Sequence, residues 1–81
     1  MKKKSANEIM RGAKSLMDAL DKIISICQDD MDMNDPNRVR ILKTIGQVNS
    51  EIYDEIMHPI AKEFPDIAKE LFPNAPFSMD D

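Results

Sequence analysis

The sequence predicts an all-α protein, in which two long helices form an antiparallel helical hairpin and one or two short C-terminal helices follow. Three observations support this class. Two long segments carry apolar residues at helical spacing, a short stretch rich in aspartate separates them, and prolines cut the last third of the chain into short pieces. With 81 residues, a single domain with a modest core is expected.

The first long helix is expected over residues 6–28, after a flexible basic N-terminus at residues 1–5. Ser5 and Glu8 have the spacing of a capping box. The apolar residues that follow recur every three or four positions and lie within an arc of roughly 120° on a helical wheel. They are Ile9, Ala13, Leu16, Met17, Leu20, Ile23, Ile24 and Cys27. This helix therefore has one apolar stripe, as a helix with one main neighbour would.

An acidic turn at residues 29–35 leads to a second helix over residues 36–57. Asp35 can cap this helix, and Pro36 suits its first position because the amide that proline lacks has no partner there. Two helices of nearly equal length joined by a short polar turn are expected to pack antiparallel. The apolar residues of 36–57 spread over roughly 180°. One antiparallel neighbour cannot cover so wide a face, so this helix also contacts the C-terminal segment or another chain.

A candidate interface between two chains follows from the spacing within the second helix. Alternating steps of three and four residues connect a heptad-like row with Asn49 at its centre. The row consists of Leu42, Ile45, Asn49, Ile52 and Ile56. A buried asparagine in such a row can pair with its equivalent in a second chain, so a dimeric four-helix bundle core is favoured slightly over a monomer. Alternatively, Asn49 bonds a local backbone carbonyl or a water molecule within one chain.

The last third of the chain is expected to form one or two short helices over residues 59–72. The sequence from Ile60 to Pro65 recurs seven residues later, and Pro59 and Pro65 each remove a backbone donor. Whether Pro65 kinks one helix or separates two stays open. Residues 73–81 are expected to be an extended acidic tail. Its end has the composition of a short docking peptide, or else of a frayed terminus; the candidate residues are Phe77, Met79, Asp80 and Asp81.

The acidic turn resembles the start of a calcium-binding loop, but only in part. Asp30, Asp32 and Asn34 match the first three ligand positions of that pattern. Asp35 then stands where a glycine is needed for the sharp turn, and Ile41 stands where a bidentate glutamate is needed. We therefore expect a polar turn that caps the second helix, with weak divalent-cation binding as the alternative.

Composition and charge argue against several kinds of function. The net charge is −4, and an acidic chain with only a basic N-terminal end argues against broad nucleic-acid binding. No apolar stretch approaches the ~20 residues of a membrane span. The basic N-terminus is interrupted by charges too early for a signal peptide. A chain that opens with Met and carries no visible tag is expected to be complete, and its single cysteine is typical of a reducing, cytoplasmic setting.

These observations favour a protein without catalytic activity or cofactor. His58 and Cys27, each the sole residue of its type, form no recognisable zinc or nucleophile constellation. The leading hypothesis is a small acidic helical protein that acts by protein–protein interaction, as an adaptor, regulator or inhibitor, and that self-associates as a homodimer. Two alternatives stay open. One is a cation-responsive hairpin that uses residues 29–35, and the other is a nucleic-acid-associated protein that uses the basic front of the first helix.

Overall fold

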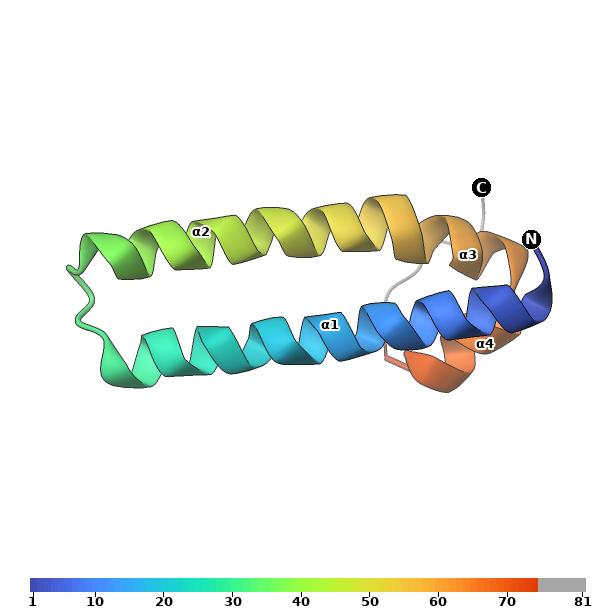
Figure 1. The fold of residues 1–81 in the computed structure, drawn as a ribbon, viewed down its shortest axis with the longest axis horizontal. Coiled ribbons are helices and arrows are strands. Elements are labelled where there is room, and N and C mark those ends of the chain that lie inside the picture. Colours follow the sequence, from blue (N-terminus) through green and yellow to red (C-terminus); the bar gives the residue numbers. More distant parts are fainter. Residues whose placement is uncertain (75–81) are drawn as a thin grey trace.

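The prediction of an all-α protein is confirmed by the computed structural model, which describes residues 1–74 and contains no strand within them. α1 (Lys3–Asp30) and α2 (Pro36–Glu51) are the two long helices, joined by a short loop. A π-helical turn, η1 (Ile52–Met57), continues α2 into α3 (His58–Glu63), and α4 (Pro65–Leu71) follows. In Figure 1, α2 runs back alongside α1, and α3 and α4 lie near the N-terminus.

α1 begins earlier than the sequence predicts. The helix starts at Lys3 instead of residue 6, and no side chain caps its first turn, so Ser5 and Glu8 do not form the expected capping box. Two ion pairs connect the start of the chain to its C-terminal part. The N-terminal ammonium lies 3.6 Å from Glu63, and Lys3 pairs with Asp66. The helix thus includes residues that were expected to be flexible, and these residues lie beside α3 and α4.

α2 begins as the sequence predicts. The Asp35 side chain accepts a hydrogen bond of 2.9 Å from the amide of Asn37, and Pro36 occupies the first helical turn. A carboxylate that accepts from this orphan amide also favours the positive end of the helix dipole. α1 extends to Asp30, two residues beyond its expected end, so the acidic turn is shorter than residues 29–35.

Pro59 does not interrupt the helix, but Pro65 does. The turn η1 widens the helix just before Pro59, and the amide of His58 donates to the carbonyl of Tyr53, five residues earlier. At Phe64 the backbone leaves the helical region, with φ −130° and ψ 71°. Proline disfavours helical geometry in the residue before it. Pro65 therefore separates α3 from α4 instead of kinking a single helix.

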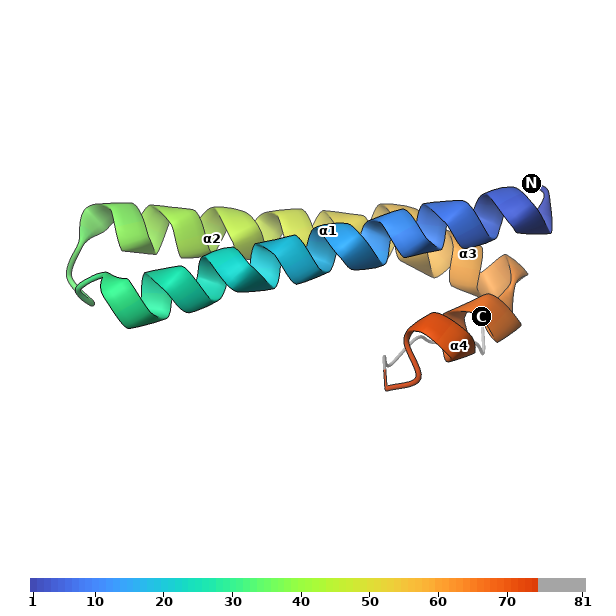
Figure 2. The same ribbon diagram turned by 60° about the horizontal axis from the view of Figure 1, so that its bottom comes forward.

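The hydrophobic core lies at one end of the molecule. Its buried residues come from the first half of α1 and from the chain after Ile52: Ala6, Met10, Ala13, Ile52, Met57, Ile60, Ala61, Ile67, Ala68 and Leu71. Figure 2 shows why, because α3 and α4 fold beneath this end of the long helices and leave the loop end uncovered. The molecule measures 45 × 23 × 20 Å. Its radius of gyration of 14.9 Å exceeds the roughly 11–12 Å of a compact chain of this length.

Candidate interaction surface

Several large apolar side chains of α1 remain exposed outside the core. Ile9 is 42%, Leu16 47% and Ile23 41% exposed, and these three residues recur every seven positions. Ile26, three residues after Ile23, is 57% exposed. Scattered apolar residues are normal at protein surfaces. A seven-residue repeat along one helix is different, because it forms a continuous line on one side of that helix.

Small uncharged residues complete this line. Starting at Ser5, steps of four and three residues connect seven exposed positions that carry no charge, and we call this set the outer seam of α1. The outer seam consists of Ser5, Ile9, Gly12, Leu16, Ala19, Ile23 and Ile26. At 100° per residue these positions fall within an arc of about 100°. Gly12 is open to its surroundings, since no atom lies within 4 Å of a Cβ placed on it.

α4 packs on a different side of α1. Arg11 lies 3.9 Å from Glu70 of α4, and the Lys14 ammonium lies 5.8 Å from the centre of the Phe72 ring, just after α4. On a helical wheel, Lys3 and Lys14 lie about 170° around α1 from the centre of the outer seam, and Arg11 lies about 110° from it. Along with the exposure of all seven seam residues, this placement leaves the outer seam without a covering element among residues 1–74.

The interface predicted on the second helix is not on one surface of the single chain. Ile45 and Ile52 are each only 5% exposed, so both are already packed within the chain. Leu42 and Asn49 are half-buried, whereas Ile56 is 40% exposed. The row of five residues changes to another side of the helix at η1, because a π-helical turn holds an extra residue and rotates the positions that follow. A role for these five residues between two chains stays a prediction.

Asn49 has an unsatisfied polar atom. Its side-chain oxygen Oδ1 is buried and accepts no hydrogen bond from another protein group within the described residues. The local bond to a backbone carbonyl, which the sequence left open, would use the amide nitrogen and would leave this oxygen unsatisfied. A buried acceptor without a partner costs about 1–3 kcal/mol. Substitution of Asn49 therefore tests whether this oxygen lowers the stability of the single chain.

The acidic turn acts as a helix cap in this structure. Asp30 is the last residue of α1, whereas Asp32 and Asn34 lie in the loop, and all three are exposed. The carbonyl of Asp32 accepts a hydrogen bond of 3.0 Å from the amide of Asp35, whose own side chain caps α2. Residues 1–74 contain no group of three or more histidine, cysteine, aspartate or glutamate side chains placed to hold a metal ion.

One hydrogen bond joins the two long helices near the loop that connects them. The Arg38 Nε donates to the carbonyl of Cys27 over 3.1 Å. The Cys27 side chain is buried with a free thiol, as expected for a small apolar group in the stripe of α1. His58 stacks in parallel with Tyr53, with 6.3 Å between the ring centres. Cys27 and His58, the single cysteine and the single histidine of the chain, therefore both have structural contacts.

The basic front of α1 faces acidic side chains of the same chain. The N-terminal ammonium, Lys3 and Arg11 lie beside Glu63, Asp66 and Glu70, respectively. The hydrogen bond from Lys3 holds the pKa of the Asp66 carboxyl below its usual value. Exposed pairs of this kind contribute little individually, but together they reduce the positive charge that this surface could offer to a phosphate.

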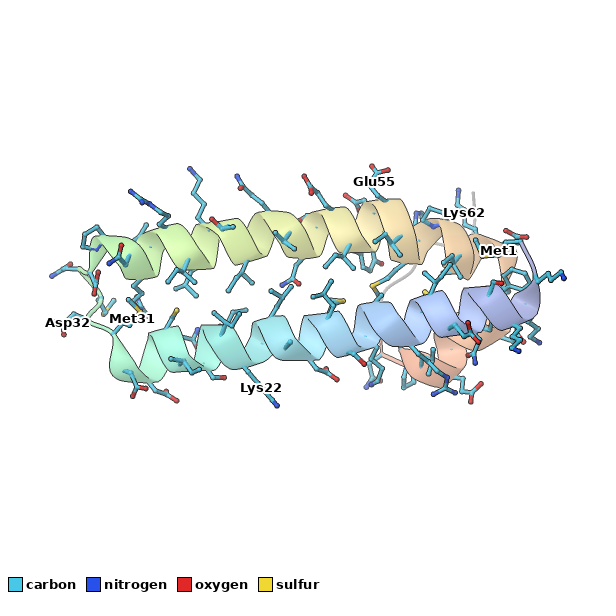
Figure 3. The ribbon with its side chains drawn as sticks, viewed as in Figure 1. Met1, Lys22, Met31, Asp32, Glu55 and Lys62 are labelled. Carbon is cyan, nitrogen blue, oxygen red and sulfur yellow. The ribbon has the colours of Figure 1, made fainter. Side chains whose placement is uncertain are left out.

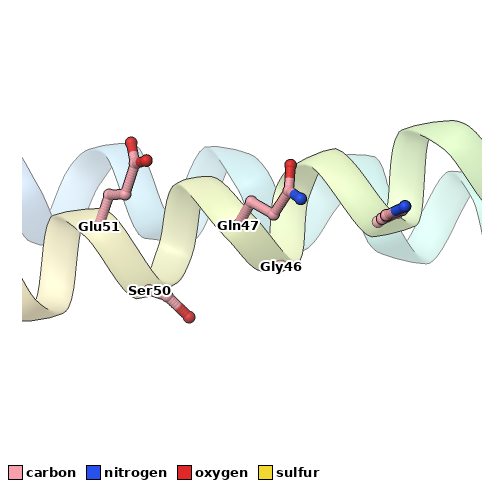
Figure 4. Close-up of a pocket in the computed structure, with 5 residues that line it drawn as sticks. Gly46, Gln47, Ser50 and Glu51 are labelled. Carbon is pink, nitrogen blue, oxygen red and sulfur yellow. The ribbon is translucent and has the colours of Figure 1, made fainter.

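A shallow depression lies on the outer side of α2 (Figure 4). Its lining residues are Lys43, Gly46, Gln47, Ser50 and Glu51. All five are exposed and belong to one helix. Ligand sites are usually concave and enclosed by several elements, so this depression has no wall that would hold a small molecule.

No known family model, curated protein or solved structure matches this chain. Within residues 1–74, none of the helices combines the length and the apolar character needed to cross a bilayer. The candidate docking residues Phe77, Met79, Asp80 and Asp81 lie outside the described residues. The sequence analysis placed Ile9, Leu16 and Ile23 in the apolar stripe that was expected to face one neighbour, whereas the structure leaves all three exposed. It therefore did not distinguish the outer seam from that stripe. The signal was present as an uncharged row with steps of four and three residues between Ser5 and Ile26.

Proposed function

We propose that this chain is a non-enzymatic protein that acts by protein–protein interaction and that it self-associates, with the helical hairpins of two copies forming a dimeric bundle. The observation that carries the proposal is the row of large apolar side chains at Ile9, Leu16 and Ile23, which are 42%, 47% and 41% exposed beside the buried stripe of the same helix. Covering this row would remove apolar surface from water, which is the main favourable term in protein association.

The small core supports the same proposal. Short domains bury a limited share of their surface and often gain stability from a partner chain. Here, buried side chains are concentrated at one end, and Cys27 and Ile45 are the buried apolar residues outside the main cluster within residues 1–74. A second chain along the long helices would supply the packing that α3 and α4 provide only near the N-terminus.

The alternatives drawn from the sequence receive less support. The ion pairs of Lys3 and Arg11 with α4 occupy part of the basic front that a nucleic-acid partner would use. Asp35 already serves as the cap of α2, which removes one carboxylate from a possible cation site. The proposal includes a cytoplasmic setting, because a lone buried thiol at Cys27 suits a reducing compartment.

Light scattering across a concentration series tests the self-association. The single chain has a mass of 9.2 kDa, and we expect a mass twice as large that falls toward this value on dilution. A mass that stays at 9.2 kDa at every concentration would overturn the proposed self-association. The apolar row would then have to serve a different protein.

A further inference from the structure

The outer seam of α1 alternates large and small residues in a regular way. One heptad position carries Ile9, Leu16 and Ile23, and the other carries Ser5, Gly12 and Ala19 before ending at Ile26. The seam covers 22 residues, or about 33 Å at 1.5 Å per residue. A helix that packs on it can insert its own large side chains beside the small ones, as ridges fit into grooves.

We infer that a second copy of this chain packs on the outer seam, α1 against α1, in an antiparallel arrangement. This inference rests on the proposed self-association and specifies its surface and register. In the register that places Leu16 of each copy opposite Gly12 of the other, Ile9 faces Ala19 and Ile23 faces Ser5. Every large residue of these three then meets a small one, so the two helices can approach closely without clashes.

A parallel arrangement lacks this fit. Parallel seams place each position opposite its own copy, so Gly12 would face Gly12 and Ala19 would face Ala19. Layers of two small residues would alternate with layers of two large ones. The large layers would hold the helices apart and leave gaps at the small layers, and unfilled space in an interface loses van der Waals contacts.

The charges beside the seam select the same antiparallel register. Glu8, Ser15 and Lys22 occupy one flank of the seam at seven-residue spacing, and all three are exposed. Figure 3 shows Lys22 pointing away from α2, on the free side of α1. With Leu16 opposite Gly12, Glu8 of one copy lies within about two residues, or roughly 3 Å along the axis, of Lys22 of the other. Because the two copies are related by a two-fold axis, the dimer contains two such Glu8–Lys22 pairs.

The neighbouring register reverses this complementarity. A slip by one heptad, which places Ile9 opposite Ile26, brings Glu8 of one copy beside Asp29 of the other, and like charges repel. It also places Ser5 opposite the charged Asp30. Side-chain size and charge thus favour one register independently. α4 leaves the seam residues open, because its ion pairs are with Lys3 and Arg11, which lie outside the seam, and all seven seam residues are exposed.

The first test uses Leu16→Asp and Gly12→Leu in the full chain, with the mass followed by light scattering. Leu16 is 47% exposed, and no atom lies within 4 Å of a Cβ at Gly12, so both variants should keep the fold of the single chain. We expect each to raise the dimer dissociation constant at least tenfold. Gly12→Leu is informative because it improves helix propensity while its side chain collides with Leu16 of the second copy.

Val39→Asp is the matched control for these variants. Val39 is 57% exposed on α2, so a charge there changes a similar apolar group on the other long helix and should leave the mass unchanged. Circular dichroism checks that all variants remain helical. A dimer that Leu16→Asp and Gly12→Leu leave intact would overturn the seam while leaving the self-association in place.

Charge exchange tests the register. Glu8→Lys makes position 8 repel Lys22 of the second copy, and Lys22→Glu makes position 22 repel Glu8, so each variant alone should dimerise about tenfold more weakly at low salt. A mixture of the two variants restores both attractive pairs and should form a heterodimer with close to the original affinity. Failure of the mixture to recover affinity would overturn the antiparallel register, even if Leu16→Asp abolishes the dimer.

Discussion

At the scale of single residues, Asn49 shows most clearly how the chain departs from the best packing available to it. The residue lies on α2 between the buried Ile45 and the buried Ile52, the first residue of η1, yet its Oδ1 accepts no hydrogen bond from another protein group. Removing an unsatisfied buried acceptor gains back its lost hydration. Spacing alone identified Asn49 as unusual, whereas the absence of an acceptor bond to Oδ1 became evident only from the packed structure.

Asn49→Leu should raise the free energy of unfolding by about 1–3 kcal/mol, because leucine fills a similar volume without a polar atom that needs a partner. Urea denaturation followed by circular dichroism measures the change. Gln47→Leu is the matched control, since Gln47 lies two positions earlier on the exposed side of α2. A loss of stability for Asn49→Leu would mean that Oδ1 has a partner in solution, such as Asn49 of a second copy.

At the scale of elements, η1 decides which residues of the C-terminal third face the core. A π-helical turn holds one residue more than an α-helical turn would. This extra residue rotates Met57, Ile60 and Ala61 inward, where they are 1%, 4% and 0% exposed. Glu55 points away from α1 in Figure 3 and is exposed. The periodicity of residues 36–57 could not reveal this change, because it assumes a uniform 100° per residue.

Deletion of Glu55 should therefore be tolerated, because it converts η1 to ordinary α-helix and keeps Met57, Ile60 and Ala61 facing the core. Deletion of Gln47 from the regular part of α2 is the control. It rotates Ile45 by about 100° relative to Ile52 and should cost at least the burial of one isoleucine, about 1.5–3 kcal/mol. Urea denaturation compares the two. Equal destabilisation by both deletions would contradict the role assigned to η1.

At the scale of the whole molecule, stability is unevenly distributed along the long axis. The end near the N-terminus contains the main hydrophobic cluster. The loop end is held by Cys27, Ile45 and the hydrogen bond from Arg38 to the carbonyl of Cys27. Regions with few buried apolar contacts open at lower free energy than the core. This asymmetry follows from the place where α3 and α4 pack.

Amides in residues 38–44 should exchange with solvent faster than amides in residues 56–63, which pack in the main core. Native-state hydrogen exchange, read by mass spectrometry or NMR, measures this difference. The comparison is best made with Leu16→Asp at low concentration, where a second copy would not protect the surface. Equal protection in both segments would show that the loop end is as stable as the core and would contradict the uneven distribution.

The sequence by itself determined the helical class, the start of α2 and the candidate turn. These features depend on local chemistry: the 3.6-residue period of apolar side chains, the acceptor at Asp35 and the fixed backbone of Pro36. The outer seam was also encoded locally, in the uncharged row between Ser5 and Ile26. Its separation from the core was not, because the sequence does not state which edge of the apolar stripe of α1 the rest of the chain covers.

Only the tertiary structure decided the remaining features. The first turns of α1 pack Ala6 and Met10 into the core and bring Lys3 beside Asp66, which is more than fifty residues away along the chain. The separation of α3 from α4 at Phe64 and the inward rotation after η1 depend on how these segments pack beneath α1. Long-range contacts of this kind override local preference, because burial of a whole apolar face outweighs the fractions of a kcal/mol that separate local conformations.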